Sequence, residues 1–401
     1  MAERATSRFR HRGVSDPLEA RAISAEVVGR VLRSGAYSNV LAQKATANLA
    51  PRDRARVKGL VFGVLRRLET IDEAIQTGAQ RRLDSLESSI LDRLRVSGFE
   101  ILYGDLPAAV AVSAGVDLVR AGNPRAAGLA NAILRRVSSL DRPSSTGLIL
   151  PTWLVMGLEK EWGTEQTEDF ARASAVEPER IVRVRDGGAD GFAGISGAVA
   201  AEPGPIPDGS VVQDAASIGV GNVVEAGAGM RVLDIAAAPG GKTLHLIDQA
   251  GTDGVVIAMD RHRRRVSDAA RRVPDARWVV ADGTMPPFPG GSFDRVLLDA
   301  PCSGLGTLRR RPEIRLRVTE SDVKELADVQ RRMLEKALEL LAPGGRLVYS
   351  VCTVTPEETV GVAGAFDLQP ADLPGMAWGN GRLLAPHLTS TDGMFVAVHQ
   401  R

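Results

Sequence analysis

The chain has 401 residues, of which 44% are hydrophobic and 25% are charged, and this composition excludes a disordered or collagen-like chain. Its length predicts two or three globular domains, each able to bury a core. No apolar run approaches the roughly 18 residues of a membrane helix, and no apolar segment follows the basic first residues. We therefore expect neither a membrane span nor a secretory signal.

Cysteine and charge content narrow the class of protein further. The two cysteines, Cys302 and Cys352, are too few for a disulfide scaffold or a tetrahedral zinc site, so we expect a reduced, cytoplasmic protein without a metal. Nothing in the sequence demands a dimer, and a monomer is expected. Residues 1–150 carry 23 Lys and Arg against 15 Asp and Glu, whereas residues 151–401 carry 27 against 34. This asymmetry hints at an anionic partner such as nucleic acid. A solvated arginine-rich surface would also explain the charge distribution, without any partner.

The first part of the chain is predicted to be helical. Residues 1–15 have the composition of a disordered basic arm. Over residues 16–140 apolar residues recur at helix spacing, and alternating strand patterns are absent. Residues 141–208 are predicted to be a linker and a small α/β connecting region. That region contains a helix around Glu159 to Ala175, a strand at 181–185 and a Gly/Pro-rich stretch without an assignment.

From Met230 onward, short β-branched runs alternate with helical stretches, which predicts a parallel sheet covered on both faces in an α/β domain over residues 209–401. The expected strands cover residues 231–236, 255–260, 278–282, 295–299 and 346–352. A helix over 321–341 should end at Pro343-Gly344-Gly345. Residues 394–399 should form a last edge strand.

Polar or reactive residues lie at or near the ends of these strands: Asp234, Asp260, Asp282, Asp299 and Cys352. An isolated Asp in this position is often a turn or helix cap. Ligands of open α/β sheets bind outside the carboxyl ends of the strands, however, so the whole set predicts one shared crevice.

The loop after the first strand predicts a cofactor site. Its small residues let a ligand approach the backbone, and the next helix offers free N–H groups. Asp260 could accept hydrogen bonds from both hydroxyls of a ribose, and Asp282 could accept one from an adenine amino group. This pattern fits an adenosine-type ligand. The absence of G-x-G-x-x-G counts against NAD. The loop consists of Ala236, Ala237, Ala238, Pro239, Gly240, Gly241 and Lys242.

A P-loop NTPase acting on RNA is the main alternative. Gly241-Lys242-Thr243 matches the end of G-x-x-x-x-G-K-[ST], and residues 295–299 could be its acidic strand. Against this, Ala236 replaces the first glycine and Pro239 removes an N–H donor. The NTPase reading also leaves both cysteines unexplained. Free cysteines are usually buried apolar residues, but two thiols at one crevice suggest covalent chemistry.

Three segments resemble the Sun family of RNA cytosine-C5 methyltransferases: DIAAAPGGKT (234–243), LLDAPCSGLGTLRRRPEI (297–314) and YSVCTVTPEE (349–358). VFGVLRR (61–67) and NAILRR (131–136) resemble the NusB-like helical RNA-binding domain fused to one bacterial branch, whose members methylate a cytosine of small-subunit ribosomal RNA. The resemblance omits the arm and residues about 186–206. Val351, Ala236 and Thr359 stand where the family usually has Thr, Cys and Asn.

The resemblance implies a Rossmann-like fold that binds S-adenosyl-L-methionine along residues 236–242, with Asp260 on the ribose and Asp282 near the adenine. Cys352 would add to cytosine C6, and Cys302 would assist elimination and release. Asp299 would hold the base near N3 and N4 beside the cofactor. Lys242 would cap the loop.

RNA contacts are expected from arginines, because a base must be unpaired or flipped out to reach a thiol. Arg309, Arg310, Arg311, Arg315 and Arg317 could hold phosphates, with a second anchor at Arg66, Arg67, Arg135 and Arg136. Arg261, Arg263, Arg264 and Arg265 are expected to form an outer helix face. A non-catalytic RNA-binding assembly factor with a vestigial site is the remaining hypothesis.

Overall fold

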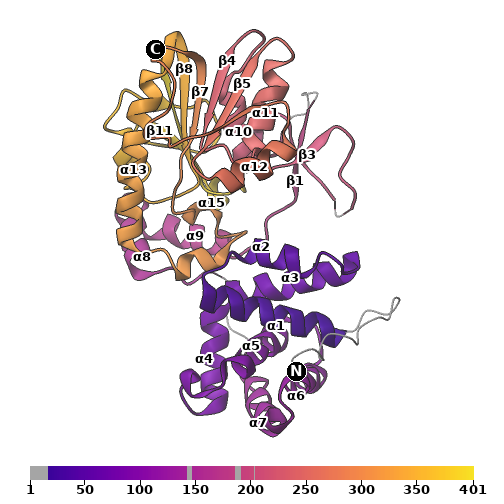
Figure 1. The fold of residues 1–401 in the computed structure, drawn as a ribbon. Helices are drawn as coiled ribbons and strands as arrows, with labels where there is room; N and C mark the ends of the chain where they lie inside the picture. Colours follow the sequence, from indigo (N-terminus) through magenta and orange to yellow (C-terminus); the bar gives the residue numbers. More distant parts are fainter. Residues whose placement is uncertain (1–16, 142–146, 186–190, 203) are drawn as a thin grey trace, which may run out of the picture. The chain divides into compact units, whose positions relative to one another are not determined.

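A computed structural model describes residues 17–141, 147–185, 191–202 and 204–401 (Figure 1). The chain divides into two compact units, Met1–Thr146 and Gly147–Arg401. The expected disordered arm at residues 1–15 lies outside the described residues. Within the described ranges no helix is long and apolar enough to cross a membrane.

The first unit is helical, as its apolar periodicity predicts. α5 (Ser88–Tyr103) packs against five other helices of this unit, and its buried face carries Leu94 and Ile101. A buried ion pair joins Arg21 Nε to Glu100 Oε2 at 2.5 Å. The other helices are α1 (Pro17–Ser34), α2 (Ser38–Ala45), α3 (Pro51–Arg66), α4 (Leu68–Ala79), α6 (Ala108–Gly122) and α7 (Ala127–Val137).

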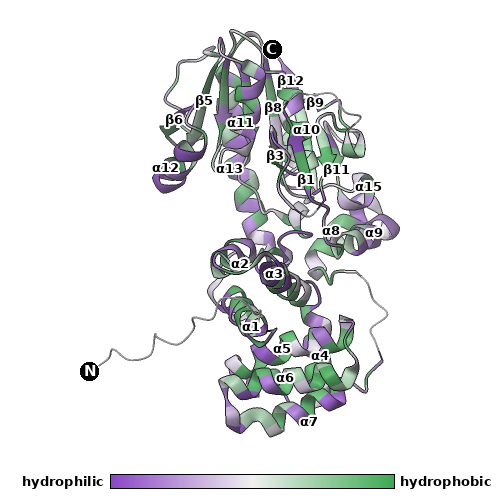
Figure 2. Cartoon of the chain, turned by 90° about the vertical axis from the view of Figure 1, so that its right-hand side faces the viewer, coloured by the Kyte–Doolittle hydropathy of each residue, from purple (hydrophilic) through white to green (hydrophobic). Residues whose placement is uncertain are grey.

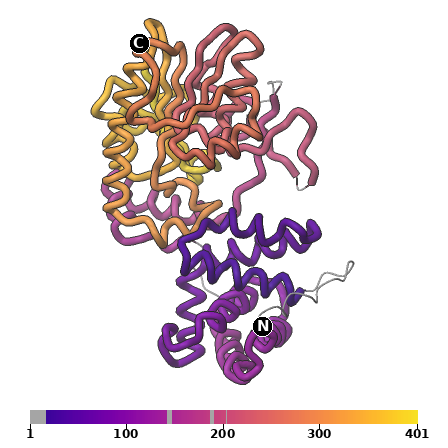
Figure 3. The backbone as a smooth tube through the Cα atoms, in the orientation of Figure 1, coloured from indigo at the N-terminus to yellow at the C-terminus, as the bar shows by residue number. Residues whose placement is uncertain are grey.

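The second unit begins with two helices and a small antiparallel sheet. α8 (Thr152–Trp162) and α9 (Thr164–Ser174) precede β1 (Ile181–Val184), which pairs with β2 (Ala198–Ala200) and β3 (Ser210–Val212). The single helix expected around Glu159 to Ala175 is wrong, because Gly163 separates two helices with φ +81°. The Trp162 ring meets Trp378 at 5.5 Å, and Figure 3 traces this early segment alongside the C-terminal part of the same unit.

A nine-stranded sheet follows, with eight strands in the order β10-β11-β12-β8-β7-β4-β5-β6 and β9 (Gln369–Pro370) paired to β12. Strands β4 to β8 are parallel, as predicted, and β12 runs antiparallel to β8. The strands are β4 (Arg231–Ile235), β5 (Val255–Asp260), β6 (Arg277–Val280), β7 (Phe293–Asp299), β8 (Leu341–Val351), β10 (Met376–Trp378), β11 (Gly381–Leu384) and β12 (Met394–Gln400).

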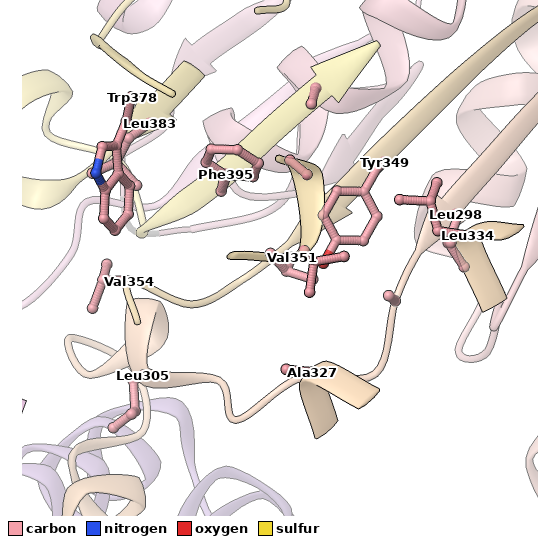
Figure 4. Packing of buried hydrophobic residues seen from close by; sticks show 14 of the residues in the cluster. Leu298, Leu305, Ala327, Leu334, Tyr349, Val351, Val354, Trp378, Leu383 and Phe395 are labelled. Atoms are coloured by element: carbon pink, nitrogen blue, oxygen red, sulfur yellow. The ribbon is translucent and has the colours of Figure 1, made fainter. Parts of the chain in front are cut away.

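Helices cover both faces of this sheet. α10 (Ala215–Val224) and α11 (Gly241–Ala250) pack on one face, and α12 (Arg263–Arg272) packs on β5 and β6. α13 (Glu320–Glu339) packs on β7 and β8 from the other face. α14 (Val360–Ala363) and α15 (Pro386–Thr389) are short. Figure 4 shows the apolar core under the site, where Leu298, Leu334, Tyr349 and Phe395 pack together.

Three other sequence expectations need correction. Residues 394–399 are not an edge strand, because β11 pairs with β12 on the side away from β8. Pro343-Gly344-Gly345 does not precede the strand but lies within β8, where the pairing with β7 shifts register and Gly344 takes φ +75°. β6 ends at Val280, so Asp282 follows the strand by two residues.

Candidate active site

The two cysteines meet at the carboxyl edge of the sheet. β7 leads through Asp299 to Cys302, and β8 ends one residue before Cys352. β7 and β8 are parallel neighbours, so their carboxyl ends lie side by side. Both thiols are free, and their Sγ atoms are 3.2 Å apart. The convergence expected from the sequence is therefore present.

The surroundings of the two sulfur atoms distinguish them. The Cys302 thiol donates to Cys352, and this hydrogen bond lowers the pKa of Cys352 against the opposing effect of burial. The nearby cations of Arg311 and Lys242 lower it further, while Asp299 opposes them. The same hydrogen bond, together with burial and the charges of Cys352, Glu358 and Asp299, raises the pKa of Cys302 well above its usual value. Negative charge is therefore favoured on Cys352.

Lys242 and Asp299 form an ion pair beside the thiols. Lys242 Nζ donates to Asp299 Oδ2 at 2.8 Å, and Ser350 Oγ donates to Asp299 Oδ1 at 2.8 Å. Burial lowers the pKa of Lys242, but the Asp299 carboxylate outweighs it and raises that pKa. Lys242 was expected to cap the cofactor loop, and the structure instead directs its ammonium group to Asp299.

Asp234, in β4, interacts electrostatically with both members of this pair. Its Oδ2 accepts a hydrogen bond from Thr243 Oγ1 at 2.6 Å, and its buried Oδ1 accepts none within the described part of the chain. Burial raises the pKa of Asp234 to about 7. This carboxyl group thus changes charge near neutral pH, next to the Lys242–Asp299 pair.

A cavity of about 420 Å³ adjoins the cysteine loops. Three of the predicted cofactor residues line it, namely Ala236, Asp260 and Asp282, together with Pro301 and Met333. The remaining predicted loop residues, from Ala237 to Lys242, are not among its lining residues. The volume falls within the range of small-molecule sites. The wall contributed by α13 carried no recognisable sequence signal; its residues are Asp322, Glu325, Leu326, Val329 and Met333.

Two of the four acidic side chains that line this cavity, Asp260 and Asp282, are held in place by local bonds. Asp260 Oδ1 accepts from the His262 amide at 2.9 Å, and Asp282 Oδ1 accepts from the Thr284 amide at 2.8 Å. Asp260 Oδ2 is buried and accepts no hydrogen bond among the described residues, although Arg265 lies at 3.3 Å. A hydroxyl donor of a bound ligand would satisfy this oxygen.

Glu358 is a site residue that the sequence reasoning missed. Its carboxylate is fully buried and accepts from the Ser303 amide at 2.8 Å and from Ser303 Oγ at 2.5 Å, both beside Cys302. It also accepts from Thr353 Oγ1 at 3.1 Å, beside Cys352, and from Thr355 Oγ1 at 2.8 Å. Gln330 Nε2 donates to it at 3.0 Å from α13. One carboxylate thus ties both cysteine loops together.

The two substitutions next to this network are accommodated. Val351, where a Thr is usual, is fully buried in the apolar core (Figure 4). Thr359, where an Asn is usual, donates its hydroxyl to Thr355 O at 2.7 Å. Neither change leaves the cysteine loops without support.

Most arginines after Cys302 bond within the protein rather than face an RNA strand. Arg309 and Arg315 are buried, and their guanidinium groups donate to Ser390 O at 2.7 Å and Ile149 O at 3.0 Å. Arg310 pairs with Asp392 at 2.8 Å and with Asp214 at 2.9 Å. Burial leaves Arg309 and Arg315 little surface to offer a polyanion, and their expected phosphate-binding role stays a prediction. Arg311 and Arg317 are partly exposed, and Arg311 donates to Thr307 Oγ1 at 3.1 Å.

The arginines expected to anchor RNA in the helical unit are also partly engaged. Arg66 lies over the Phe62 ring and Arg67 over the Tyr103 ring. Arg136 donates to Gly78 O at 2.9 Å, and Arg135 is exposed. These contacts within the protein do not test RNA binding by the four arginines, which stays a prediction.

Comparisons with known proteins define the class. Residues 223–400 match the family model described as 16S rRNA methyltransferase RsmB/F, and residues 18–139 match the NusB family. The crystal structure of PH0851 superposes with a TM-score of 0.76 at 22% identity, covering 97% of this chain and 100% of that one. The fold is therefore a NusB-like helical unit followed by an α/β methyltransferase unit, as predicted.

Full-length relatives identify the family. Ribosomal RNA small subunit methyltransferase B of Xanthomonas campestris pv. campestris is 33% identical over 390 residues, which cover 87% of this chain and 89% of that protein. The protein of the same name from Salmonella paratyphi B is 32% identical over 376 residues, covering 84% and 87%. The chain belongs to the RsmB/F family of RNA methyltransferases, which confirms the resemblance and excludes the NTPase reading.

Proposed function

We propose that this protein transfers the methyl group of S-adenosyl-L-methionine to C5 of a cytosine in small-subunit ribosomal RNA through a covalent adduct with Cys352. The observation that carries the proposal is the pair of thiols 3.2 Å apart beside a ligand-sized cavity. The relatives' name supplies the ribosomal substrate, and the NusB match supports RNA binding by the helical unit.

The cavity residues fit this cofactor. The buried Asp260 Oδ2, which accepts no hydrogen bond among the described residues, suits a ribose hydroxyl, and Asp282 would lie near the adenine. NSun6 from Pyrococcus horikoshii, solved with SFG, shares this fold with a TM-score of 0.54 at 19% identity over 62% of this chain and 98% of its own. When bound, the cofactor supplies an electrophilic methyl group.

Cys352 starts the reaction by adding its thiolate to C6 of the cytosine, because C5 is itself a poor nucleophile. The new S–C6 bond moves electron density to C5, which would take the methyl group as its bond to the cofactor sulfur breaks and S-adenosylhomocysteine leaves. Asp299 would accept a hydrogen bond from the N4 amino group, and the Lys242 ammonium would stabilise charge that develops on the ring. A base then removes the C5 proton, and the S–C6 bond breaks.

Cys302 serves the second half of the reaction. In the free protein its proton is retained because the hydrogen bond to Cys352, burial and repulsion by the Cys352 thiolate raise the pKa of Cys302. Once Cys352 is a neutral thioether, that repulsion is gone, so Cys302 ionises more readily. It can then assist elimination at C5 and release of the product.

The proposal is tested by methyl transfer from radiolabelled S-adenosyl-L-methionine to protein-free small-subunit ribosomal RNA, with nucleoside analysis of the product. Label in 5-methylcytosine with wild type, and none with Cys352→Ala, is the expected result. Failure to label any RNA despite measurable cofactor binding would favour the non-catalytic assembly factor instead.

A further inference from the structure

We propose that the exposed arginines at the start of α12 form a binding surface for the phosphate groups of the RNA substrate. This inference rests on the proposed function, since it assumes that RNA approaches the cysteine loops. It reassigns to α12 the phosphate contacts expected from the segment after Cys302, where Arg309 and Arg315 are buried and Arg310 is paired with two carboxylates.

Positive charge is concentrated on α12 and the residues that flank it, whereas the rest of the unit is acidic. Residues 261–277 contain seven arginines and two aspartates, a net charge of +5. The remaining residues of 151–401 contain 20 Lys and Arg against 32 Asp and Glu, a net charge of −12. A local positive patch on an otherwise acidic unit attracts a polyanion to that place alone. Figure 2 shows α12 as a strongly hydrophilic helix.

The packing of α12 directs these arginines outward. Val266 and Ala269 are buried and attach the helix to the sheet. The side chains of Arg263 and Arg264 are exposed and make no hydrogen bond or ion pair with any described residue, in contrast to that of Arg265. The one acidic residue of the helix, Asp268, is paired with Arg271 instead.

Helix stability does not explain this arrangement. The first turn of a helix carries partial positive charge, so arginines there are electrostatically unfavourable. Arg263 and Arg264 occupy that turn, and no acidic side chain of the described residues offsets them by an ion pair. The Asp260 carboxylate at this end of the helix pairs with Arg265 only, so the charges of Arg263 and Arg264 are left for a ligand to offset.

The position of the patch is suited to the substrate. β5 ends at Asp260, so α12 begins at the same carboxyl edge of the sheet that carries the cysteine loops. Arg261 and Arg265 line the cavity assigned to the cofactor, which Pro301 of the Cys302 loop also lines. An RNA strand that delivers a base to Cys352 thus reaches this edge, where guanidinium groups can hold its phosphates by bidentate bonds.

The test is the salt dependence of RNA affinity for the double variant Arg263→Gln/Arg264→Gln, measured by fluorescence anisotropy with a single-stranded ribosomal RNA fragment. Loss of two phosphate contacts should reduce the slope of log K against log salt by about 1.4. The affinity of the variant relative to wild type should therefore be about 25-fold lower at 0.1 M salt than at 1 M salt. In methyl-transfer assays the variant should raise KM for RNA and leave kcat largely unchanged.

The matched control is Arg231→Gln/Lys336→Gln, which removes the same charge from the amino end of β4 and the last turns of α13. The surface is confirmed if only the α12 variant loses affinity and slope. It is refuted if the α12 variant binds like wild type, or if both variants lose affinity equally. Wild-type methylation measured in parallel separates these outcomes from failure of the proposed function.

Discussion

Replacement of Glu358 by Gln tests whether one buried carboxylate holds the two cysteine loops in register. Glu358 Oε2 accepts three hydroxyl hydrogen bonds, from Ser303, Thr353 and Thr355. An amide at this position removes the charge and turns one acceptor into a donor. At about 1 kcal/mol of lost charge assistance per bond, we expect about 3 kcal/mol of destabilisation.

This loss corresponds to a fall in melting temperature of about 6–12 °C for a unit of this size. The loops that carry Cys302 and Cys352 should shift relative to each other, and a displacement of about 1 Å can cost about 100-fold in rate. The assays are thermal unfolding and single-turnover methyl transfer at a temperature where the variant is folded. We expect kcat to fall far more than KM for RNA rises, because Glu358 supports the cysteine loops and bonds to none of the α12 arginines.

Two companion variants keep this prediction falsifiable. Glu357→Gln makes the same chemical change one residue earlier, outside the network, and should alter stability by no more than about 0.5 kcal/mol. Thr355→Val removes one donor to Glu358 together with the long 3.4 Å hydroxyl contact to Thr353, and should give an intermediate loss of rate. Wild-type activity and stability in Glu358→Gln would refute the reasoning.

The remaining predictions concern titration and thiol reactivity. Burial raises the pKa of Asp234 to about 7, so the folded state retains this proton, and stability should fall as pH rises from about 4 through 7 by up to about 4 kcal/mol. Asp234→Asn should therefore lose less melting temperature than wild type between pH 5 and pH 8, and an equal loss would contradict the assignment. Iodoacetamide at pH 7.5 should alkylate Cys352 before Cys302, because the hydrogen bond from Cys302 and the cations of Arg311 and Lys242 favour the Cys352 thiolate. Lys242→Met should slow that alkylation, and faster modification of Cys302, read by peptide mass spectrometry, would overturn the order.

The sequence predicted the parts of this molecule that depend on local periodicity. Helical spacing in the first unit and β-branched runs from Met230 onward correspond to the observed helices and parallel strands. The convergence of Cys302 and Cys352 was also predictable, because parallel strands end at the same edge of a sheet. The interior place of β12 was not, since strand order depends on pairing with β11 rather than on the strand's own residues.

Side-chain partners were the least predictable feature. The sequence suggested phosphate binding by Arg309 and Arg315, but the fold brings backbone carbonyls from distant segments to their guanidinium groups. The sequence showed Glu358 only as part of a motif. Its bonding role was not predictable, because its five donors come from three separate parts of the chain. The arginines of α12, by contrast, lie on an exposed outer face as the sequence predicts, and this exposure leaves Arg263 and Arg264 available to a ligand.

Covalent trapping tests the central claim, division of labour between the two thiols, most directly. Cys302→Ala is incubated with small-subunit ribosomal RNA and S-adenosyl-L-methionine, and the mixture is resolved under denaturing conditions. We expect a protein–RNA adduct through Cys352 that persists, because release is impaired, and no adduct with Cys352→Ala or with the double variant. Full turnover by Cys302→Ala without an adduct, or an adduct that survives Cys352→Ala, would contradict the account.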